Sequence, residues 1–488
     1  MEKQDTPIAL ERPFSLNNLM LLGLFVSFFL YPFGRLQSLL IPDMTLSVII
    51  LPILCLTVLF RYRLKLKIPT VVFPLCGFAV WACLWLFKAP GDNYLEIAFM
   101  VFYASMVIMI FNLSMQVRDI DRLLYLYVAG LSIVSIATVL SYLSLLPGDF
   151  FGELPLIQNF DYNAYATIVH GSKENPNAFA VFFIIAIPIA FYLRKKADRP
   201  RLKKLLGYTL ILLCFTLFIT LSRSAILAAG ISTLGYFFLL GKINVRRGIF
   251  YLGLLGIVFA IAINAVSILT VVGGTVKHAD EIATEKITET AIEMKNEGGF
   301  IGFVGKQILT ILDILKRGGT KHFDIRSTTM AKDISTELHI HVTFLALRIM
   351  MEHPLFGIGY GNFSEHLLAL DPALEIYEID TPHNSIIGMG VYFGIPALIL
   401  FSAFTLWVFW GVFCATRDDR METEKRNLAA LFLGLLIGYY LNMLFHDSHN
   451  SSLFWLCLGL AVRFMRPCTA IELRDTLYLR FRKTVNQV

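Results

Sequence analysis

The amino-acid sequence predicts an all-α, polytopic membrane protein of about twelve transmembrane helices, and three observations support this fold class. The 488 residues are 56% hydrophobic and only 16% charged, whereas a soluble protein carries about 25% charged residues. Apolar runs of about 17 residues or more recur along most of the chain, which is enough to cross a bilayer as a helix. Within lipid, a helix satisfies its backbone hydrogen bonds internally, so these runs are expected to be helical.

Twelve apolar segments are the candidates for these spans. The seventh and eighth are the least distinct pair, because only Ser222-Arg223-Ser224 separates them. In chain order the candidates are 16–33, 43–60, 69–87, 94–116, 122–144, 176–193, 206–222, 224–240, 248–271, 384–410, 428–445 and 452–466.

Lysine and arginine are distributed unequally between the two sides that these spans define. With the N-terminus placed inside, the inner segments carry 28 of the 42 basic residues, the short outer loops carry 4, and the outer segment 272–383 carries the other 10. Cytoplasmic loops are the ones enriched in lysine and arginine, so both termini are expected in the cytoplasm. Topology and anionic lipid account for the positive charge, so membrane lipids are expected partners and nucleic acid is not.

Four regions follow from this topology. The long outer segment is the only one with room for a small domain outside the membrane, and it is net negative. The regions are 1–271 with the first nine helices, 272–383 as the outer loop domain, 384–466 with the last three helices, and 467–488 as a basic cytoplasmic tail.

The outer loop domain is expected to be helical. Apolar residues between Val304 and Leu315 repeat at helical spacing and are followed by Gly318-Gly319, which indicates an amphipathic helix with a glycine stop. A second helix is expected from about Asp333 to Glu352, with His353-Pro354 ending it. Such helices could lie along the membrane surface and cover a cavity between the spans.

The distribution of ionisable groups places the chemistry at the outer rim of the membrane. All ten histidines lie in predicted outer segments, and no acidic or basic side chain lies near the middle of a predicted span. A proton-coupled transporter keeps ionisable groups near the membrane midplane, so transport is disfavoured. The seven cysteines show no metal-ligand spacing, and no disulfide, metal or cofactor is expected.

Two residues at outer helix ends are the main candidates for this chemistry. Arg223 lies between two apolar helices, where its planar fork of donors suits a phosphate or diphosphate. The alternative is an arginine that extends from a helix end towards water. His383, at the start of the tenth span, could accept a proton from a hydroxyl. The alternative is a loop histidine at a helix cap.

Two further stretches are typical of helix ends and tight turns. Asn175-Pro-Asn177 opens the sixth span as a capped helix start, although Asn177 could face a cavity. The stretch His353–Phe363 includes Gly359 and Gly361 but lacks the strand and the spacing of a dinucleotide loop. It predicts a tight turn whose backbone approaches a ligand or another helix. Between the last two spans, His446, Asp447 and His449 are more typical of a solvated turn than of a metal site.

Together these stretches resemble the O-antigen ligase and polymerase family of membrane glycosyltransferases. The likeness covers about Asn175 to Leu400, and the order and topology of its motifs make it more specific than any one of them. The motifs are Asn175-Pro-Asn177, Leu221-Ser-Arg-Ser-Ala225, His353-Pro-Leu-Phe-Gly-Ile-Gly-Tyr-Gly-Asn-Phe363, and His383-Asn384 followed by Gly394.

The resemblance implies glycan transfer at the periplasmic face of a bacterial inner membrane. Members of the family pass a glycan from an undecaprenyl-diphosphate carrier to an acceptor hydroxyl, such as that of a glycan or lipid A core, without a metal. By resemblance, Arg223 would bind the carrier diphosphate and His383 would position or deprotonate the acceptor. Asn177, His339, Asn384, Gly359 and Gly361 would support the site.

The chain departs from the family pattern at two places. The family has a second arginine upstream of the His-Pro-Leu stretch, at a place that falls near His339 here. Arg326 and Arg348 are the alternatives for this second cation, and Arg326 is favoured because Arg348 lies on apolar final turns of a helix. Ala397 stands where the ligase form carries glycine, threonine or tyrosine, which leaves a ligase and a repeat-unit polymerase as alternatives.

Two function classes outside this family fit the sequence less well. A polysaccharide exporter is disfavoured by the uncharged centres of the spans and by the lack of an internal repeat. A non-catalytic membrane scaffold leaves the outer histidines and arginines unexplained.

Overall fold

The computed structural model describes a set of segments that includes most of the predicted spans. The predicted helix around 304–315, Arg326 and His339 lie outside this set. The described residues are 16–33, 50, 53–54, 57, 67–85, 94–142, 157–159, 167–169, 176–220, 222–241, 341–372, 374, 379–446, 451–465 and 476–478.

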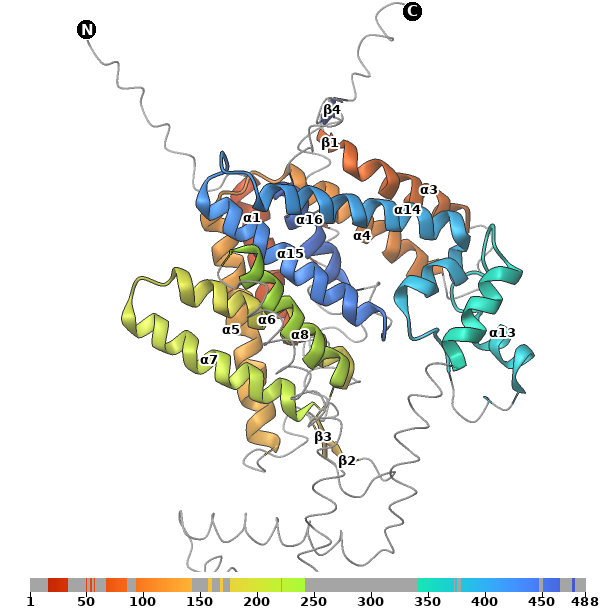
Figure 1. Cartoon of the computed structure of the whole chain (residues 1–488), viewed down its shortest axis with the longest axis horizontal. Coiled ribbons are helices and arrows are strands. Elements are labelled where there is room, and N and C mark those ends of the chain that lie inside the picture. Colours follow the sequence, from red (N-terminus) through yellow and green to blue (C-terminus); the bar gives the residue numbers. More distant parts are fainter. Residues whose placement is uncertain are drawn as a thin grey trace, which may run out of the picture.

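The described part of the chain is helical almost throughout, as the sequence predicts (Figure 1). Two antiparallel pairs of three-residue strands are the exceptions, β1 (Lys67–Pro69) with β4 (Thr476–Tyr478) and β2 (Ile157–Asn159) with β3 (Thr167–Val169). The main helices are α1 (Leu16–Leu30), α3 (Phe73–Trp85), α4 (Tyr94–Asn112), α5 (Val117–Tyr142), α6 (Pro176–Lys196), α7 (Pro200–Ile219), α8 (Arg223–Leu239), α13 (Phe363–Leu370), α14 (Ser385–Thr416), α15 (Thr423–Met443) and α16 (Ser452–Phe464).

The described helices coincide with the predicted spans, except at 43–60 and 248–271. Residues 248–271 lie outside the described part, and 43–60 is described at a few positions only. Four helices, α5, α6, α7 and α14, are long and apolar enough to cross a membrane, and several shorter apolar helices accompany them. The total of twelve spans therefore stays a prediction. The uncertain seventh and eighth spans are separate helices, α7 and α8.

The helices alternate in direction, and hydrogen bonds show which of their ends lie together. At one end of the helices, Asp121 at the start of α5 accepts hydrogen bonds from Tyr192 and Lys196 at the end of α6, both at 2.7 Å. Lys196 also pairs with Glu424 at the start of α15, at 3.2 Å. This cluster ties three helices together through the buried Asp121, the half-buried Lys196 and the exposed Glu424.

Arg463 joins two further helix ends on the same side. It lies in the last turn of α16 and donates to backbone carbonyls at the end of α4 and just beyond it, among them Ile110 at 2.8 Å and Leu113 at 2.6 Å. A guanidinium is favoured there, because the last carbonyls of a helix have no intrahelical donor.

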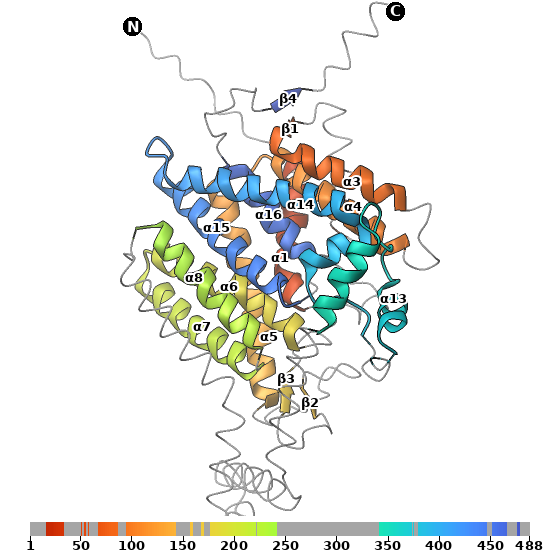
Figure 2. The same cartoon turned by 45° about the vertical axis from the view of Figure 1, so that its right-hand side comes forward.

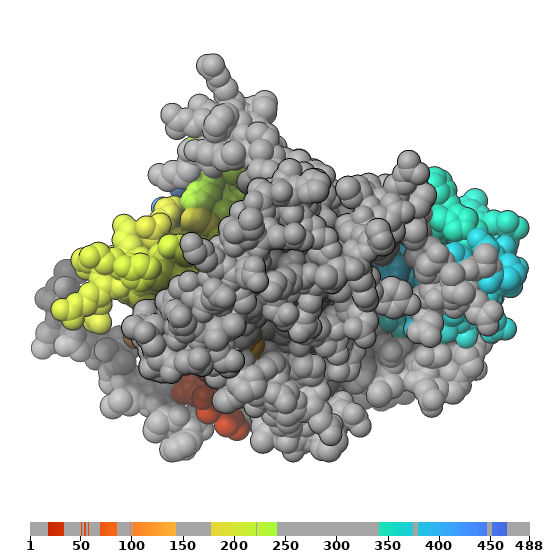
Figure 3. All heavy atoms as spheres, turned by 90° about the horizontal axis from the view of Figure 1, so that it is seen from below, coloured from red at the N-terminus to blue at the C-terminus, as the bar shows by residue number. Residues whose placement is uncertain are grey.

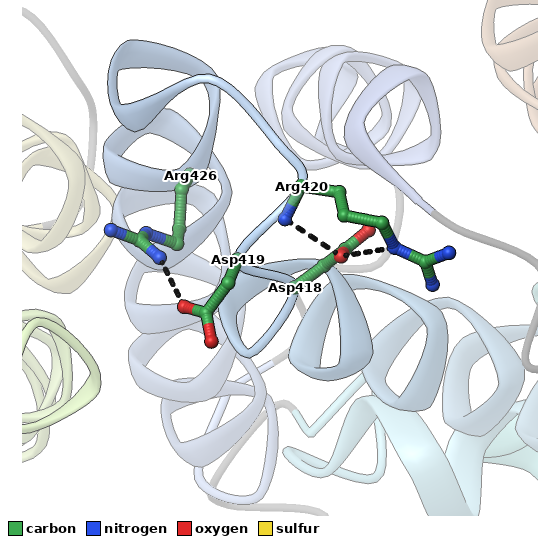
Figure 4. A network of polar contacts seen from close by, with 4 residues as sticks. All are labelled: Asp418, Asp419, Arg420 and Arg426. Atoms are coloured by element: carbon green, nitrogen blue, oxygen red, sulfur yellow. Dashed lines mark hydrogen bonds and ion pairs between the residues drawn. The ribbon is translucent and has the colours of Figure 1, made fainter.

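The turn between α14 and α15 lies on this side as well, and its charges pair locally (Figure 4). Arg426 donates to Asp419 at 2.9 Å, and Arg420 donates through its backbone amide and its side chain to Asp418. The basic connections that the sequence predicts to be cytoplasmic thus gather at one end of the described helices. Charge pattern and packing therefore agree on which helix ends belong together.

Helix α14 differs from the continuous span predicted at 384–410. It is longer and is interrupted at Gly394, whose φ of 85° and ψ of 169° are not helical. Pro396 follows two residues later. Because a proline has no N–H and its ring clashes with the preceding turn, carbonyls before it lose their helical partners. The break explains how the helix can extend over 32 residues without being one straight rod.

Neighbouring segments provide hydrogen bonds for the backbone groups at this break. The carbonyls of Val391 and Tyr392 accept from the amides of Ile358 and Gly359, at 2.9 and 3.0 Å. The indole N–H of Trp81, in α3, donates to the carbonyl of Phe393 at 2.8 Å. Such replacement is required where a helix breaks away from water, since an unpaired backbone group there costs several kcal/mol.

The glycine-rich stretch is the segment that fits against this break. The chain is helical from 341 to 352 and leaves the helix at His353-Pro354, as predicted. Gly357, Gly359 and Gly361 have positive φ angles of 67°, 82° and 86°. A Cβ on Gly357 would overlap the carbonyl of Val391. The tight turn predicted from the sequence is thus present, and its backbone approaches another helix, α14.

Replacing Gly394 by alanine should destabilise the protein by about 3 kcal/mol or more. The added Cβ would fall on the carbonyl of Leu355 and would sit on a residue with positive φ. Gly241→Ala is the matched control, because Gly241 has a similar φ of 64° but no described atom within 4 Å of the added Cβ. It should cost about 1 to 2 kcal/mol. Unfolding midpoints in one detergent measure both, and equal losses would contradict the close packing at the break.

Candidate functional site

Two of the sequence motifs meet at a single turn of the chain. This turn, residues 444–446, follows the end of α15 and is called the 444–446 turn below. The Ser224 hydroxyl, in the first turn of α8, lies 2.7 Å from His446 Nε2. On the other side, Ser385 Oγ donates to the carbonyl of His446 at 2.7 Å, and Asn384 Nδ2 donates to the carbonyl of Leu444 at 3.1 Å. Ser224, next to Arg223, and Asn384 and Ser385, just after His383, therefore form hydrogen bonds with the same turn.

Glycines on α15 bring α8 to this position. Gly434 and Gly438 are four residues apart and face α8, which packs against α15 and α6 (Figure 2). A Cβ on Gly438 would lie 2.6 Å from Ser232 Cβ and 2.7 Å from the carbonyl of Ala228. Only hydrogen leaves room for this approach, as in other small-residue contacts between membrane helices. The first turn of α8 consequently lies against the end of α15.

Arg223 is the first residue of α8 and is half-buried. Among the described residues, no carboxylate pairs with it and no hydrogen bond engages its guanidinium. The four N–H groups at a helix start lack intrahelical partners and carry partial positive charge, which adds to that of the side chain. A half-buried guanidinium at a helix N-terminus favours an anionic ligand.

His383 lies immediately before α14 and has an unusual backbone. Its φ is 52°, in the left-handed region that costs a residue with a side chain about 1 to 2 kcal/mol. Burial lowers the pKa of its imidazole, and the carboxylate of Asp380 opposes this with a smaller upward effect. The neutral imidazole, which can accept a proton, is therefore the favoured form at neutral pH.

The alternative explanation for His383 was a role in capping the helix, but Asn384 is the residue that caps α14. Its Oδ1 accepts from the amides of Ile386 at 3.1 Å and Ile387 at 3.0 Å, so it is the N-cap of α14. Its amide nitrogen bonds the 444–446 turn, as described above. Both ends of the Asn384 side chain thus hold the start of α14 in place beside that turn, while capping does not account for His383.

The other predicted site residues lie at different distances from this meeting point. Asn177 is half-buried in the first turn of α6, a helix that packs against α8 and α15. Gly359 is hydrogen-bonded to the break in α14, and Gly361 belongs to the same turn. The structure therefore places Gly359 against α14, while Gly361 is described only by its positive φ.

Arg348 is on the surface of the helical segment 341–352. Its side chain is 62% exposed and pairs with Glu352 at 2.9 Å. No described contact joins it to Arg223 or His383. Figure 3, which views the molecule from below, shows the segment that begins at 341 at the opposite side from α7. The other predicted cation, Arg326, and His339 are outside the described residues.

His446 is the site residue that the sequence interpretation missed. The polar turn between the last two spans was expected to be solvated, whereas His446 contacts α8 and α14. Asn442 is a polar residue in the last turn of α15, after the mainly apolar run 428–441. Asn442 is fully buried, and its amide finds no hydrogen-bond partner in the described part of the chain.

No metal cluster is present among the described residues. They contain no group of three or more histidine, cysteine, aspartate or glutamate side chains arranged to hold an ion. Of the three polar residues considered in the last outer loop, His446 contacts Ser224, and Asp447 and His449 are outside the described part.

Comparison with known proteins finds a family model that matches part of the chain. Residues 208–402 match the family model described as O-antigen ligase, an interval that contains Arg223, the glycine-rich turn, His383 and Gly394. The chain carries an O-antigen ligase family domain. The resemblance expected from the sequence is thereby confirmed. No curated protein matches the chain.

The family domain and the apolar helices together characterise the molecule. It is a membrane protein with an O-antigen ligase domain, and this family indicates a glycosyltransferase-like enzyme. The matched interval ends at 402, so α15 and the 444–446 turn lie beyond it. Asn177 lies before it.

Proposed function

We propose that this protein transfers a glycan from an undecaprenyl-diphosphate carrier to an acceptor hydroxyl, as an O-antigen ligase does. The observation that supports the proposal is that Ser224, next to the half-buried Arg223, and Ser385, two residues after the half-buried His383, both form hydrogen bonds with His446. Arg223 and His383 both belong to the O-antigen ligase domain. The proposed reaction takes place in the biosynthesis of lipopolysaccharide or another surface polysaccharide. The acceptor would be a glycan or lipid A core, and no metal would take part.

The donor half of the proposed reaction needs a group that stabilises the departing diphosphate. Displacement at the anomeric carbon breaks the bond from this carbon to the diphosphate oxygen, and negative charge develops on the leaving group. Arg223 can present two parallel N–H donors to it, and the amides at the start of α8 add to the attraction. Preorganised donors aimed at developing charge are commonly the largest contribution to catalysis.

The acceptor half needs help for the incoming hydroxyl. His383 would accept the hydroxyl proton as the oxygen attacks the anomeric carbon. Its neutral form is favoured by burial, so the base is available at neutral pH. The positive φ of His383 is consistent with a residue held in place for function, because strained backbone conformations cluster at such sites.

A second cation would complete the donor site, and Arg326 is the residue proposed for it. Arg348 is the alternative, but its guanidinium is paired with Glu352 and largely exposed. Exposure and an existing carboxylate partner both weaken its attraction for a diphosphate.

A repeat-unit polymerase of the same family is the second candidate function. The departure at Ala397 favours it, since the ligase form carries another residue there. Ala397 is fully buried in α14, just beyond the break at Gly394. The two functions differ in the acceptor, which is lipid A core for a ligase and another glycan for a polymerase. An exporter has less support, because the family is one of glycosyltransferases.

In the proposed topology the chain has twelve spans and cytoplasmic termini, and the site faces the periplasm. Cysteine labelling can test which side of the membrane each connection occupies. Single cysteines at positions 320 and 448 should react with a membrane-impermeant maleimide in intact spheroplasts. Cysteines at positions 200 and 420 should react only after the membrane is permeabilised. The basic connections at 194–204 and 417–426 support this orientation. Protection of position 320 in intact spheroplasts would reverse the topology and remove the periplasmic site.

Arg223→Lys should abolish most glycan transfer while the protein is made in normal amount. Lysine keeps the positive charge but cannot form the two parallel hydrogen bonds of a guanidinium. The measurement is surface glycan on a deletion strain that carries each variant, normalised to protein in the membrane fraction. Arg420→Lys is the matched control, because Arg420 is 78% exposed at the other end of the helices and should tolerate the change. Wild-type glycan with Arg223→Ala would refute the assignment.

His383→Ala should lower the transfer rate by about 10²- to 10⁴-fold, the range for loss of a general base. The wild-type rate should rise with pH to a plateau, because only the deprotonated imidazole accepts the proton. Since burial lowers the pKa of His383 from 6.5, the midpoint of the rise should lie below pH 6.5. The assay uses purified protein, undecaprenyl-diphosphate-linked glycan and acceptor in the presence of EDTA.

Two variants separate this role of His383 from a structural one. Asp380→Asn removes the carboxylate that raises the pKa of His383, so the midpoint should move to still lower pH. His366→Ala, on α13, is the control histidine and should leave the rate near that of wild type. A rate independent of pH, together with full activity of His383→Gln, would exclude His383 as the base.

A further inference from the structure

The 444–446 turn links the start of α8 to the start of α14. Ser224 is the residue after Arg223, and its hydroxyl is 2.7 Å from His446 Nε2. Ser385 is two residues after His383, and its hydroxyl donates to the carbonyl of the same His446 at 2.7 Å. His446 therefore contacts one helix through its side chain and the other through its backbone.

We propose that His446 is a positioning residue that sets the spacing between Arg223 and His383. The inference rests on the proposed function and adds a residue from beyond the family-matched interval, which ends at 402. Arg223 and His383 act on two reactants that must meet within bonding distance. Because small errors in such geometry lower rates strongly, a fixed connection between the two helix starts has a direct catalytic consequence.

The surroundings of His446 show why its side chain holds a definite place. The close contact of Gly438 with α8 brings the last turn of α15 against the first turn of α8. Asn384 donates to the carbonyl of Leu444 at 3.1 Å, so the turn is bonded on its α14 side at both Leu444 and His446. With the turn held on both sides, the imidazole of His446 lies within hydrogen-bond distance of the Ser224 hydroxyl.

The contact with Ser224 connects His446 to the scaffold of the donor site. Its Nε2 is engaged by a hydroxyl that belongs to the scaffold of the donor site. His446 thus acts on the reaction through Ser224 and the neighbouring Arg223. A positioning role requires the hydrogen bond but not a titrating group, and this difference can be measured.

A double-mutant cycle on the full-length protein in nanodiscs tests the proposal. The variants are Ser224→Ala, His446→Ala and the double variant, assayed for transfer from undecaprenyl-diphosphate-linked glycan. Each single variant should lower kcat by about 10- to 100-fold. The kcat of the double variant should lie within about threefold of the kcat of the less active single variant, because both substitutions remove the same contact. Ser132→Ala is the control, since its hydroxyl bonds only Val128 of its own helix, and it should be near wild type.

His446→Gln is the rescue variant, and it covers the case in which His446→Ala fails to fold. The Gln amide can reach the place of Nε2 and bond Ser224, so most of the rate should return. Binding of undecaprenyl diphosphate alone can be measured by the shift that it causes in the unfolding midpoint. In the His446 variants this binding should change less than kcat does. Multiplicative losses in the double variant, or an inactive, folded His446→Gln, would overturn the positioning role.

The same experiment distinguishes failure of this inference from failure of the proposed function. If Arg223→Lys and His383→Ala are inactive while Ser224→Ala and His446→Ala retain the wild-type rate, only the inference about His446 is wrong. If Arg223→Lys and His383→Ala also retain the wild-type rate, the proposed function of the site is wrong as well.

Discussion

The requirement that every backbone polar group away from water finds a partner governs the arrangement around α14. Gly394 and Pro396 interrupt this helix and leave carbonyls without helical donors. Trp81 and the glycine-rich turn supply the donors, so α3 and the segment after 341 are fixed against the same break. The first half of α14, which begins beside His383, owes its position to these contacts. The glycine-rich family motif is thereby explained as a partner for a broken helix.

A second constraint is the close approach of α8 to α15. Gly434 and Gly438 permit it, and the polar contacts of His446 and Ser224 lie where the two helices end and begin. At the opposite end, Asp121, Lys196 and Glu424 connect three helices. The helices around the site are therefore joined near both ends by polar contacts and along their length by apolar packing. This is the rigid support that a site made from several helices needs.

Much of the fold could be predicted from the sequence because hydrophobicity alone determines which segments can be spans. The charge of the connections correctly grouped the helix ends, and the glycines of 353–363 correctly indicated a close backbone contact. The break at Gly394 was missed, since an apolar run looks the same whether the helix continues or not. The role of His446 was missed because it depends on contacts between residues far apart in the chain. Arg223 and His383 were proposed from local motifs, and the hydrogen bonds that connect their neighbours Ser224 and Ser385 through His446 required the packing.

The position of the 444–446 turn bears on how this protein can be recombined with its relatives. The segment that matches the family model contains Arg223 and His383 but ends before α15. A chimaera that exchanged only that segment would combine the two residues proposed to act on the reactants with a foreign α15 and a foreign turn. The segment to exchange should therefore extend through residue 446. The interval matched by the family model is shorter than the stretch that contains all the residues proposed to form the site. Inheritance of donor or acceptor preference should follow the larger unit.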